Sequence, residues 1–170
     1  MATEKEKMLR ASTELMQELK ATRKIVDELN TTDSFAPEAT AMMHKLVGSV
    51  GDDESPFRCN CGYNIRIGDD VFMNWNCVLL DVSEIRIGDR TLFGPGVQVY
   101  TASHPLDPEV RASSLEYGKS VTIGDAEWIG GNAIILPGVT IDHRRWKRRD
   151  QGRAGEERVC WQPSPSSSSD

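Results

Sequence analysis

The chain has 170 residues and a formal net charge of −6, with 38% hydrophobic and 27% charged residues. This composition is that of one globular domain with a sizeable core. The acidic balance argues against nucleic acid as a main partner, because neutralising phosphates requires clustered Lys and Arg, and the only basic run is 144–149. Five of the first ten residues are charged, and no stretch reaches the roughly 18 apolar residues of a membrane span. We therefore expect a cytoplasmic protein with no membrane partner.

Residues 5–48 have the pattern of helices. Apolar residues recur there near a 3.6-residue period, which marks one apolar stripe: Met8, Leu9, Leu15, Met16, Leu19, Ile25, Val26 and Leu29. The polar run 31–34 interrupts the pattern, and Pro37 suits the first turn of a second helix. We assign residues 1–50 to an N-terminal helical segment.

A period of six residues dominates the region from 65 to 141. The main apolar positions are Ile67, Met73, Leu79, then Ile87, Phe93, Val99, then Ile123, Ile129, Ile135 and Ile141. A second apolar position lies two residues earlier, and Gly or Asp often follows the main one, as in Ile123-Gly124-Asp125. A six-residue period is typical of a parallel β-helix, in which each hexad is a short strand and a corner.

These hexads predict a mainly β fold, a parallel β-helix solenoid of about three coils within residues 51–141. The coils fall at 65–82, 85–102 and 121–138, and a fourth begins at Val139. The stretch 103–120 lacks the pattern, so we expect an inserted loop there. Loops of this length in a compact repeat domain are usually functional.

The sequence offers few groups for metal or nucleophilic chemistry. Cys59 and Cys61 are too close together for the usual zinc spacing, so we expect free thiols and no metal. Of the histidines, His44 lies on the second predicted helix and His143 begins the tail, whereas His104 opens the inserted loop. An imidazole can take a proton from a hydroxyl at neutral pH. His104 is therefore the candidate base, and the alternative is a loop histidine without a role.

Four motifs point to a known family. They are Asn-Trp-Asn-Cys-Val-Leu-Leu-Asp-Val at 74–82, Thr-Ala-Ser-His-Pro-Leu-Asp-Pro at 101–108, Leu-Glu-Tyr-Gly-Lys at 115–119 and Trp-Ile-Gly-Gly at 128–131. Over about residues 35–141 the chain resembles the maltose and galactoside O-acetyltransferases. The resemblance implies a left-handed β-helix, a homotrimer with active sites between subunits, acetyl-CoA as co-substrate and a small sugar as acceptor. Serine and xenobiotic acetyltransferases also use hexapeptide folds.

The resemblance also implies roles for six residues. His104 would remove the proton of the sugar hydroxyl, and Glu116 would orient that histidine or hold the sugar. Asn74 and Asp81 would bind the acceptor, although both could instead be plain corner residues of the coils. Trp128 would wall the cofactor channel, unless it only packs, and the backbone N–H of Gly131 would reach the pantetheine.

The last 29 residues, 142–170, depart from the family. The family continues with about one and a half more coils that contact coenzyme A. Here the hexads stop after Ile141, and an Arg-rich, then Ser- and Pro-rich tail follows, which we expect to be disordered. The alternative function is therefore a catalytically impaired or inactive solenoid protein of the same fold that lacks the C-terminal cofactor-binding coils.

Overall fold

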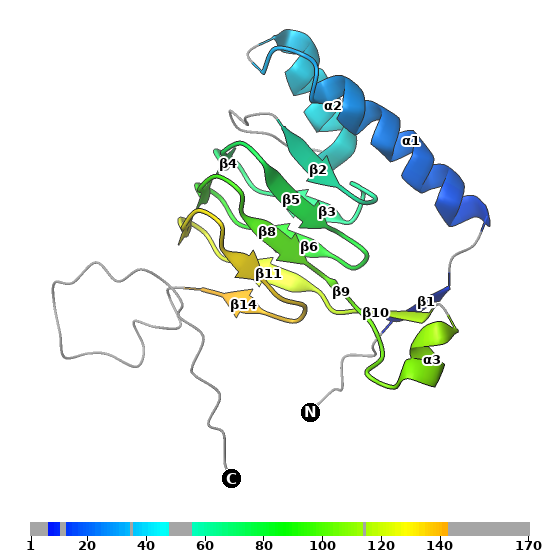
Figure 1. Ribbon diagram of the computed structural model, residues 1–170. Coiled ribbons are helices and arrows are strands. Elements are labelled where there is room, and N and C mark those ends of the chain that lie inside the picture. Colours follow the sequence, from blue (N-terminus) through cyan, green and yellow to red (C-terminus); the bar gives the residue numbers. More distant parts are fainter. Residues whose placement is uncertain (1–6, 11–12, 35, 48–55, 114, 143–170) are drawn as a thin grey trace, which may run out of the picture.

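The computed structural model describes residues 7–10, 13–34, 36–47, 56–113 and 115–142 (Figure 1). The predicted disorder of the tail 142–170 concerns residues that, apart from Asp142, lie outside this description. Within the described part of the chain, the helices are too short or too polar to cross a membrane.

Two helices occupy the N-terminal region, as the apolar periodicity predicts. Helix α1 spans Thr13–Leu29, and helix α2 spans Pro37–Val47 with Pro37 as its first residue. The helical expectation is wrong at the beginning, because Lys7–Arg10 form a strand, β1. Its partner is β10 (Leu115–Gly118), more than a hundred residues away in the sequence, so no local pattern could have signalled the pairing.

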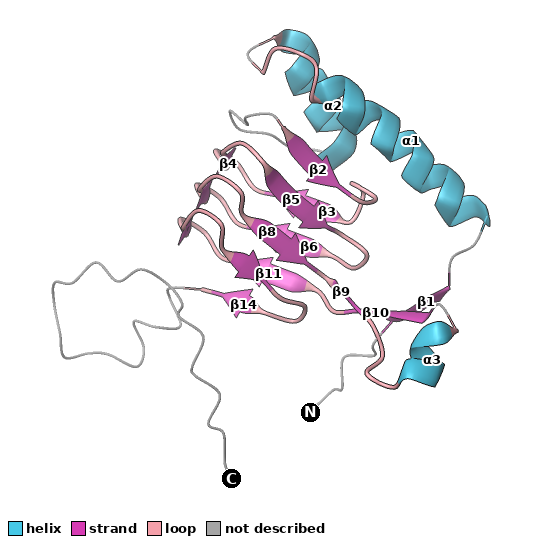
Figure 2. Cartoon of the chain, viewed as in Figure 1, coloured by secondary structure: helices cyan, strands magenta, loops and turns pink. Residues whose placement is uncertain are grey.

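Most of the remaining strands form three parallel sheets (Figure 2). The first sheet contains β3 (Ile65–Ile67), β6 (Ile85–Ile87), β11 (Val121–Ile123) and β14 (Thr140–Ile141). The second contains β4 (Phe72–Met73), β7 (Leu92–Phe93) and β12 (Trp128–Ile129). The third contains β2 (Phe57–Cys59), β5 (Cys77–Leu80), β8 (Gln98–Tyr100) and β13 (Ile134–Ile135).

Successive strands enter the three sheets in rotation, so equivalent positions of successive hexads stack on one another. In the first sheet Ile65 pairs with Ile85, which pairs with Val121, and all three side chains are fully buried. The residues between the apolar positions, such as Arg66, point outward. Burying one such side chain stabilises the fold by roughly 1.5–3 kcal/mol, which explains why the six-residue period is kept. Strand β2 extends the third sheet by one strand that the hexads did not predict.

The Gly-Asp pairs that follow the first sheet make a repeated corner. Asp89 accepts a hydrogen bond through Oδ1 from the backbone N–H of Asp69 at 3.0 Å, and Asp125 accepts one from Asp89 at 3.2 Å. Gly88 leaves room for this contact, since a Cβ there would lie 2.6 Å from the backbone nitrogen of Asp125. Each carboxylate therefore ties its corner to the preceding one.

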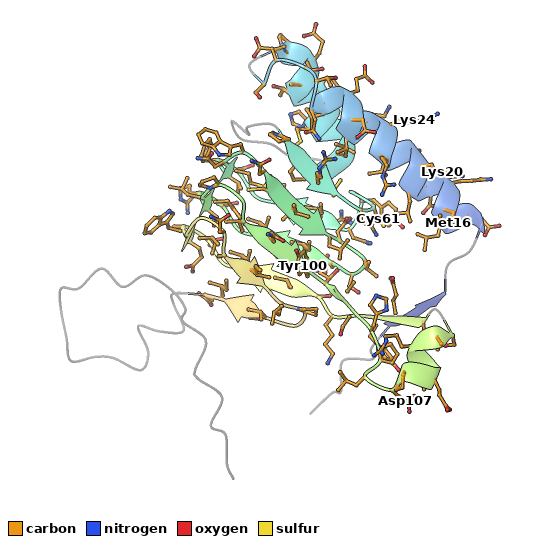
Figure 3. The ribbon with its side chains drawn as sticks, viewed as in Figure 1. Met16, Lys20, Lys24, Cys61, Tyr100 and Asp107 are labelled. Atoms are coloured by element: carbon orange, nitrogen blue, oxygen red, sulfur yellow. The ribbon has the colours of Figure 1, made fainter. Side chains whose placement is uncertain are left out.

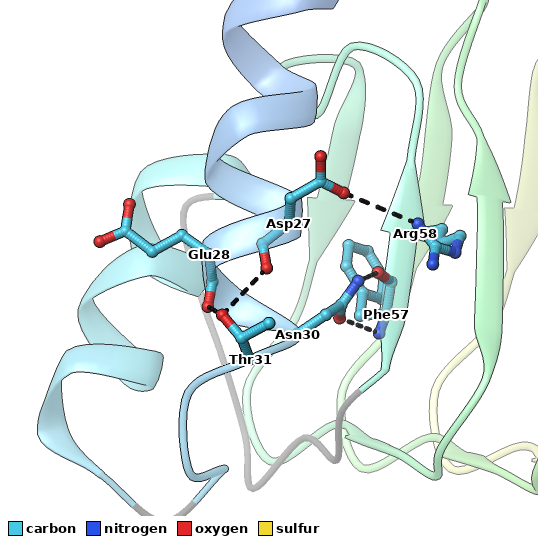
Figure 4. Close-up of polar contacts among 6 residues, drawn as sticks. All are labelled: Asp27, Glu28, Asn30, Thr31, Phe57 and Arg58. Atoms are coloured by element: carbon cyan, nitrogen blue, oxygen red, sulfur yellow. Dashed lines mark hydrogen bonds and ion pairs between the residues drawn. The ribbon is translucent and has the colours of Figure 1, made fainter.

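The helices close the end of the third sheet at β2. Asn30, just after α1, donates from Nδ2 to the carbonyl of Phe57 at 2.9 Å and accepts from its N–H at 2.7 Å (Figure 4). The amide thus takes the place of a neighbouring strand at an edge that would otherwise present unpaired groups. The nearby Asp27–Arg58 ion pair, at 4.0 Å, is largely exposed and adds little.

The inserted segment 103–120 is more ordered than the predicted loop. It begins within β9 (Ala102–Ser103) and contains helix α3 (Pro108–Ala112) and strand β10. Strands β1, β10 and β9 form a small antiparallel sheet in that order, beside the parallel sheets (Figure 1). The hexad pattern stops here because the chain leaves the stack and returns to it at β11.

Candidate active site

His104 and Glu116 come together on the antiparallel sheet. His104 directly follows β9, and Glu116 lies within β10, which pairs with β9. The Nε2 atom of His104 lies 3.7 Å from Oε1 of Glu116, and Nδ1 lies 3.4 Å from the carbonyl oxygen of Leu115. Both side chains are about half exposed, 54% for the histidine and 41% for the glutamate.

This geometry gives the two ring nitrogens different environments. A carbonyl oxygen only accepts, so the contact to Leu115 favours the tautomer that carries its proton on Nδ1. Nε2 of this half-exposed side chain then holds the free electron pair, which a general base requires. The 3.7 Å separation from Glu116 is too long for a hydrogen bond but short enough for the carboxylate to stabilise a protonated ring.

Thr101, which is fully buried, connects the antiparallel sheet to the parallel sheets. Its hydroxyl donates to the carbonyl of Leu80 at 2.7 Å and accepts from the N–H of Ser83 at 2.9 Å. Its carbonyl accepts from the N–H of Lys119 at 2.8 Å. Gly118 packs so closely on Ser83 that a Cβ would lie 2.0 Å from the hydroxyl oxygen. The segment therefore leaves and re-enters the stack at a fixed point.

Helix α3 fixes the chain just after His104. Asp107 caps it by accepting from the N–H groups of Glu109 and Val110 at 2.8 and 3.2 Å. Arg111 folds back and donates to the carbonyls of Pro105 and Leu106 at 3.1 and 3.2 Å. Figure 3 shows Asp107 at the far end of the molecule from Lys24 of helix α1. The histidine thus lies on a braced projection rather than on a free loop.

Asn74, Trp128 and Gly131 belong to the second sheet and its turns. Asn74 follows β4, and its side-chain oxygen accepts from the N–H of Trp75 at 2.8 Å. Trp128 in β12 is 65% exposed, and Gly131 lies three residues later. A Cβ built on the intervening Gly130 would meet nothing within 4 Å. The exposed indole and the open glycine backbone therefore offer a surface that a flat or extended ligand can approach.

Within one chain, the elements that carry His104 and Glu116 lie apart from the strand that precedes Asn74. Strand β4, which precedes Asn74, lies at one side of the parallel sheets, and β9 and β10, which carry His104 and Glu116, lie at the other (Figure 1). The structure therefore brings His104 and Glu116 together but does not bring them to Asn74 within one chain.

Asp81 is used inside the fold. Its side chain is fully buried, and Oδ1 accepts from the N–H groups of Asn60 and Cys61 at 2.9 and 2.8 Å. Oδ2 lies 3.4 Å from the N–H of Asn64, whose side chain donates to the carbonyl of Asp81 at 2.8 Å. Burial raises the pKa of this carboxyl, and the backbone hydrogen bonds only partly oppose the rise. A sugar hydroxyl cannot reach the carboxylate while loop 60–64 stays in place, and these contacts match the corner alternative.

The residues that support the candidate base have no signature in the sequence. Thr101 and Ser83 gave no signal, because their roles depend on contacts between different turns of the stack. The pair Asp107-Pro108 could have signalled the start of α3, because Asp is a common helix cap and Pro a common first helical residue. Among the described residues, no group of three or more His, Cys, Asp or Glu side chains is arranged to hold a metal.

Comparison with known proteins identifies the family. Nodulation protein L of Rhizobium leguminosarum bv. viciae is 46% identical over 148 residues, which cover 81% of this chain and 78% of that protein. A maltose O-acetyltransferase from Clostridium difficile 630 has a TM-score of 0.76 at 41% identity and covers 79% of this chain and 75% of its own. The chain belongs to the family of maltose and galactoside O-acetyltransferases.

The acetyltransferase also resembles a member of the family that was solved with its co-substrate. A hexapeptide-repeat acetyltransferase from Vibrio cholerae O1 biovar eltor, complexed with acetyl-coenzyme A, has a TM-score of 0.70 at 40% identity. That match covers 76% of this chain and 72% of the other. No family model matches the chain. The family resemblance stated from the four motifs is thereby confirmed, and the chain is an acyltransferase.

Proposed function

We propose that this acetyltransferase transfers the acetyl group of acetyl-CoA directly to a hydroxyl of a small sugar, with His104 as general base. The observation that carries the proposal is the pairing of His104 and Glu116 on a braced projection, with Nδ1 at a backbone carbonyl and Nε2 3.7 Å from Oε1 of Glu116. The family supports the same class of reaction, since its named members include maltose and galactoside O-acetyltransferases.

The reaction needs no covalent enzyme intermediate. Nε2 of His104 takes the proton of the sugar hydroxyl while the hydroxyl oxygen attacks the thioester carbonyl of acetyl-CoA. The tetrahedral intermediate then collapses, the C–S bond breaks, and the protonated histidine returns the proton to the departing thiolate. Glu116 stabilises the imidazolium between these steps. The products are the acetylated sugar and free CoA.

The remaining roles are assigned on the second sheet. Asn74 would hold the acceptor near the developing oxyanion, Trp128 would lie against the cofactor, and the backbone N–H of Gly131 would meet the pantetheine. The exposed indole and the open Gly130 backbone fit an extended thioester arm. For Asp81 we propose a role in shaping loop 60–64 beside the sugar, because its carboxylate is occupied by backbone N–H groups.

The proposed assembly is a homotrimer of left-handed β-helices of about three coils each within residues 51–141. Residues 1–50, which contain strand β1 and helices α1 and α2, form the segment before the β-helix. Two observations support active sites between subunits. Strand β4, which precedes Asn74, and strand β9, which precedes His104, lie at opposite sides of one chain (Figure 1), and a second copy can supply the missing half. Large apolar side chains also remain exposed on the parallel sheets and in their adjoining turns: Trp75, Leu92, Trp128, Ile134 and Leu136.

The proposal is tested by thiol release from acetyl-CoA with the full chain and a panel of glucose, maltose, galactosides and glucosamine. We expect release that depends on a sugar and falls by roughly 10²–10⁴ in His104→Ala. His44→Ala is the matched control, because His44 lies on α2 away from the projection, and it should keep full activity. A folded chain that releases no thiol and binds no acetyl-CoA by calorimetry would reject the proposal and support the non-catalytic alternative.

A further inference from the structure

Strand β1 pairs with the whole of the strand that carries Glu116. The register places Lys7 opposite Gly118, Met8 opposite Tyr117, Leu9 opposite Glu116 and Arg10 opposite Leu115. Strand β9, on the other side, pairs only with Tyr117 and Gly118. The first half of β10, where Glu116 lies, therefore has β1 as its only strand partner among the described residues.

The direction of the backbone groups in β10 follows from one hydrogen bond. Lys119 donates its N–H to Thr101 on the β9 side at 2.8 Å. In an antiparallel sheet alternate residues direct their N–H and C=O groups to opposite neighbours. The backbone N–H and C=O groups of residues 115 and 117 therefore face the β9 side. This agrees with the contact between the Leu115 carbonyl and His104. Glu116 and Gly118 direct their backbone groups to β1, where Leu9 and Lys7 stand opposite.

We infer that β1 is a positioning element of the active site, and that the backbone of Leu9 holds Glu116 and the Leu115 carbonyl against His104. The inference rests on the proposed function, because it concerns the same base. Both atoms that define the environment of the histidine ring, Oε1 of Glu116 and the carbonyl oxygen of Leu115, come from the part of β10 that β9 does not hold. The N-terminal residues thus act on catalysis through the backbone of β10.

Two proline substitutions distinguish the loss of backbone pairing between β1 and β10 from the effect of introducing a proline into β1. Leu9→Pro removes an N–H that faces β10, whereas Met8→Pro removes one that faces the open side of the edge strand, where proline is tolerated. Leu9→Ala keeps the N–H and controls for loss of the side chain. The three variants alter neither the candidate base nor Glu116.

The first readout is amide hydrogen exchange at Glu116 and Gly118 in the full chain. We expect exchange to accelerate roughly 10- to 100-fold in Leu9→Pro and to stay near the wild-type rate in Met8→Pro and Leu9→Ala. The second readout is thiol release: in Leu9→Pro the kcat should fall roughly 10- to 100-fold, while the KM for acetyl-CoA stays within about twofold. Equal exchange in the two proline variants, or faster exchange with unchanged kcat, would overturn the inference.

A third readout does not depend on turnover. The rate at which diethyl pyrocarbonate modifies His104 should change in the same direction in Leu9→Pro and Glu116→Gln, and Met8→Pro should match the wild type. If the wild type shows no sugar-dependent thiol release, the proposed function fails, and exchange and modification still decide whether β1 positions Glu116. A Leu9→Pro variant with wild-type His104 modification would reject the positioning role.

Discussion

The stacked corners can be tested by placing one methyl group between two of them. Gly88 follows β6 and lies against the next corner, where a Cβ would be 2.3 Å from Oδ1 of Asp125, 2.6 Å from its backbone nitrogen and 2.6 Å from the carbonyl carbon of Gly124. Because two of these atoms are backbone, a side-chain rotation cannot relieve the contact. We predict that Gly88→Ala is strongly destabilising.

The magnitude follows from the contacts that must change. Overpacking of this kind costs about 1–3 kcal/mol, and moving the Asp125 corner away also weakens its hydrogen bond to the N–H of Asp89, worth about 0.5–1.5 kcal/mol. Alanine also lowers the conformational entropy of the unfolded chain, which stabilises the folded protein by about 0.4–1 kcal/mol. The net loss is about 0.5–4 kcal/mol with a midpoint of about 2 kcal/mol, and the midpoint corresponds to about 4–8 °C in Tm for a chain of this length.

The assay is urea and thermal unfolding followed by circular dichroism, with Gly130→Ala as matched control. Gly130 also follows a strand of the stack, β12, but a Cβ there meets nothing within 4 Å. The control should unfold within about 0.5 kcal/mol of the wild type or be slightly more stable. If both variants lose the same free energy of unfolding, close packing of the corners does not exclude a side chain at residue 88, and the prediction is refuted.

Three further predictions concern the helical cap, the buried carboxylate and the cofactor surface. Asn30→Leu removes both hydrogen bonds to the backbone of Phe57 and should lower the free energy of unfolding by about 2–3 kcal/mol in urea titrations. Burial raises the pKa of Asp81 in the folded state, so the folded state binds the proton more tightly than the unfolded state does. The free energy of unfolding should therefore fall as pH rises above the ordinary aspartate pKa of about 3.9. Asp81→Asn should lack this fall in unfolding curves measured between pH 3 and 7. Trp128→Ala should raise the KM for acetyl-CoA about tenfold in the thiol-release assay, with little change in stability, because the side chain is 65% exposed.

Each of these predictions has a control and a contradicting result. Asp27→Asn, which alters the exposed ion pair near Asn30, should change stability by less than about 1 kcal/mol, and an equal loss in both variants would deny Asn30 its capping role. Parallel pH curves for the wild type and Asp81→Asn would show that burial does not shift this carboxyl. An unchanged KM in Trp128→Ala would remove the indole from the cofactor surface and leave it as an exposed strand residue.

The repeat of the fold was readable from the sequence because it is a local property. Each hexad buries the same two positions, so Ile87 and Ile123 signal their strands without knowledge of any neighbour. Pro37 marked the start of α2 in the same local way. The candidate base followed from its place, since His104 opens the one segment that breaks the period.

The sequence was less informative wherever a residue acts through a distant partner. Met8 and Leu9 fit a helical stripe, yet they form β1 because β10 offers them a partner more than a hundred residues later. The stretch 103–120 read as a loop, although α3 and β10 order it through capping and pairing. Asp81 read as a sugar contact, and its burial against loop 60–64 became visible only when the stack was built.

The sequence by itself determined the six-residue stack, the family and the identity of the candidate base, because periodicity and short motifs are written within a few residues. Only the tertiary structure decided what surrounds that base: the Leu115 carbonyl at one ring nitrogen, Glu116 at the other, and β1 along the strand that carries both. The physical reason is that backbone pairing between distant segments depends on register and direction in space, which no local spacing encodes.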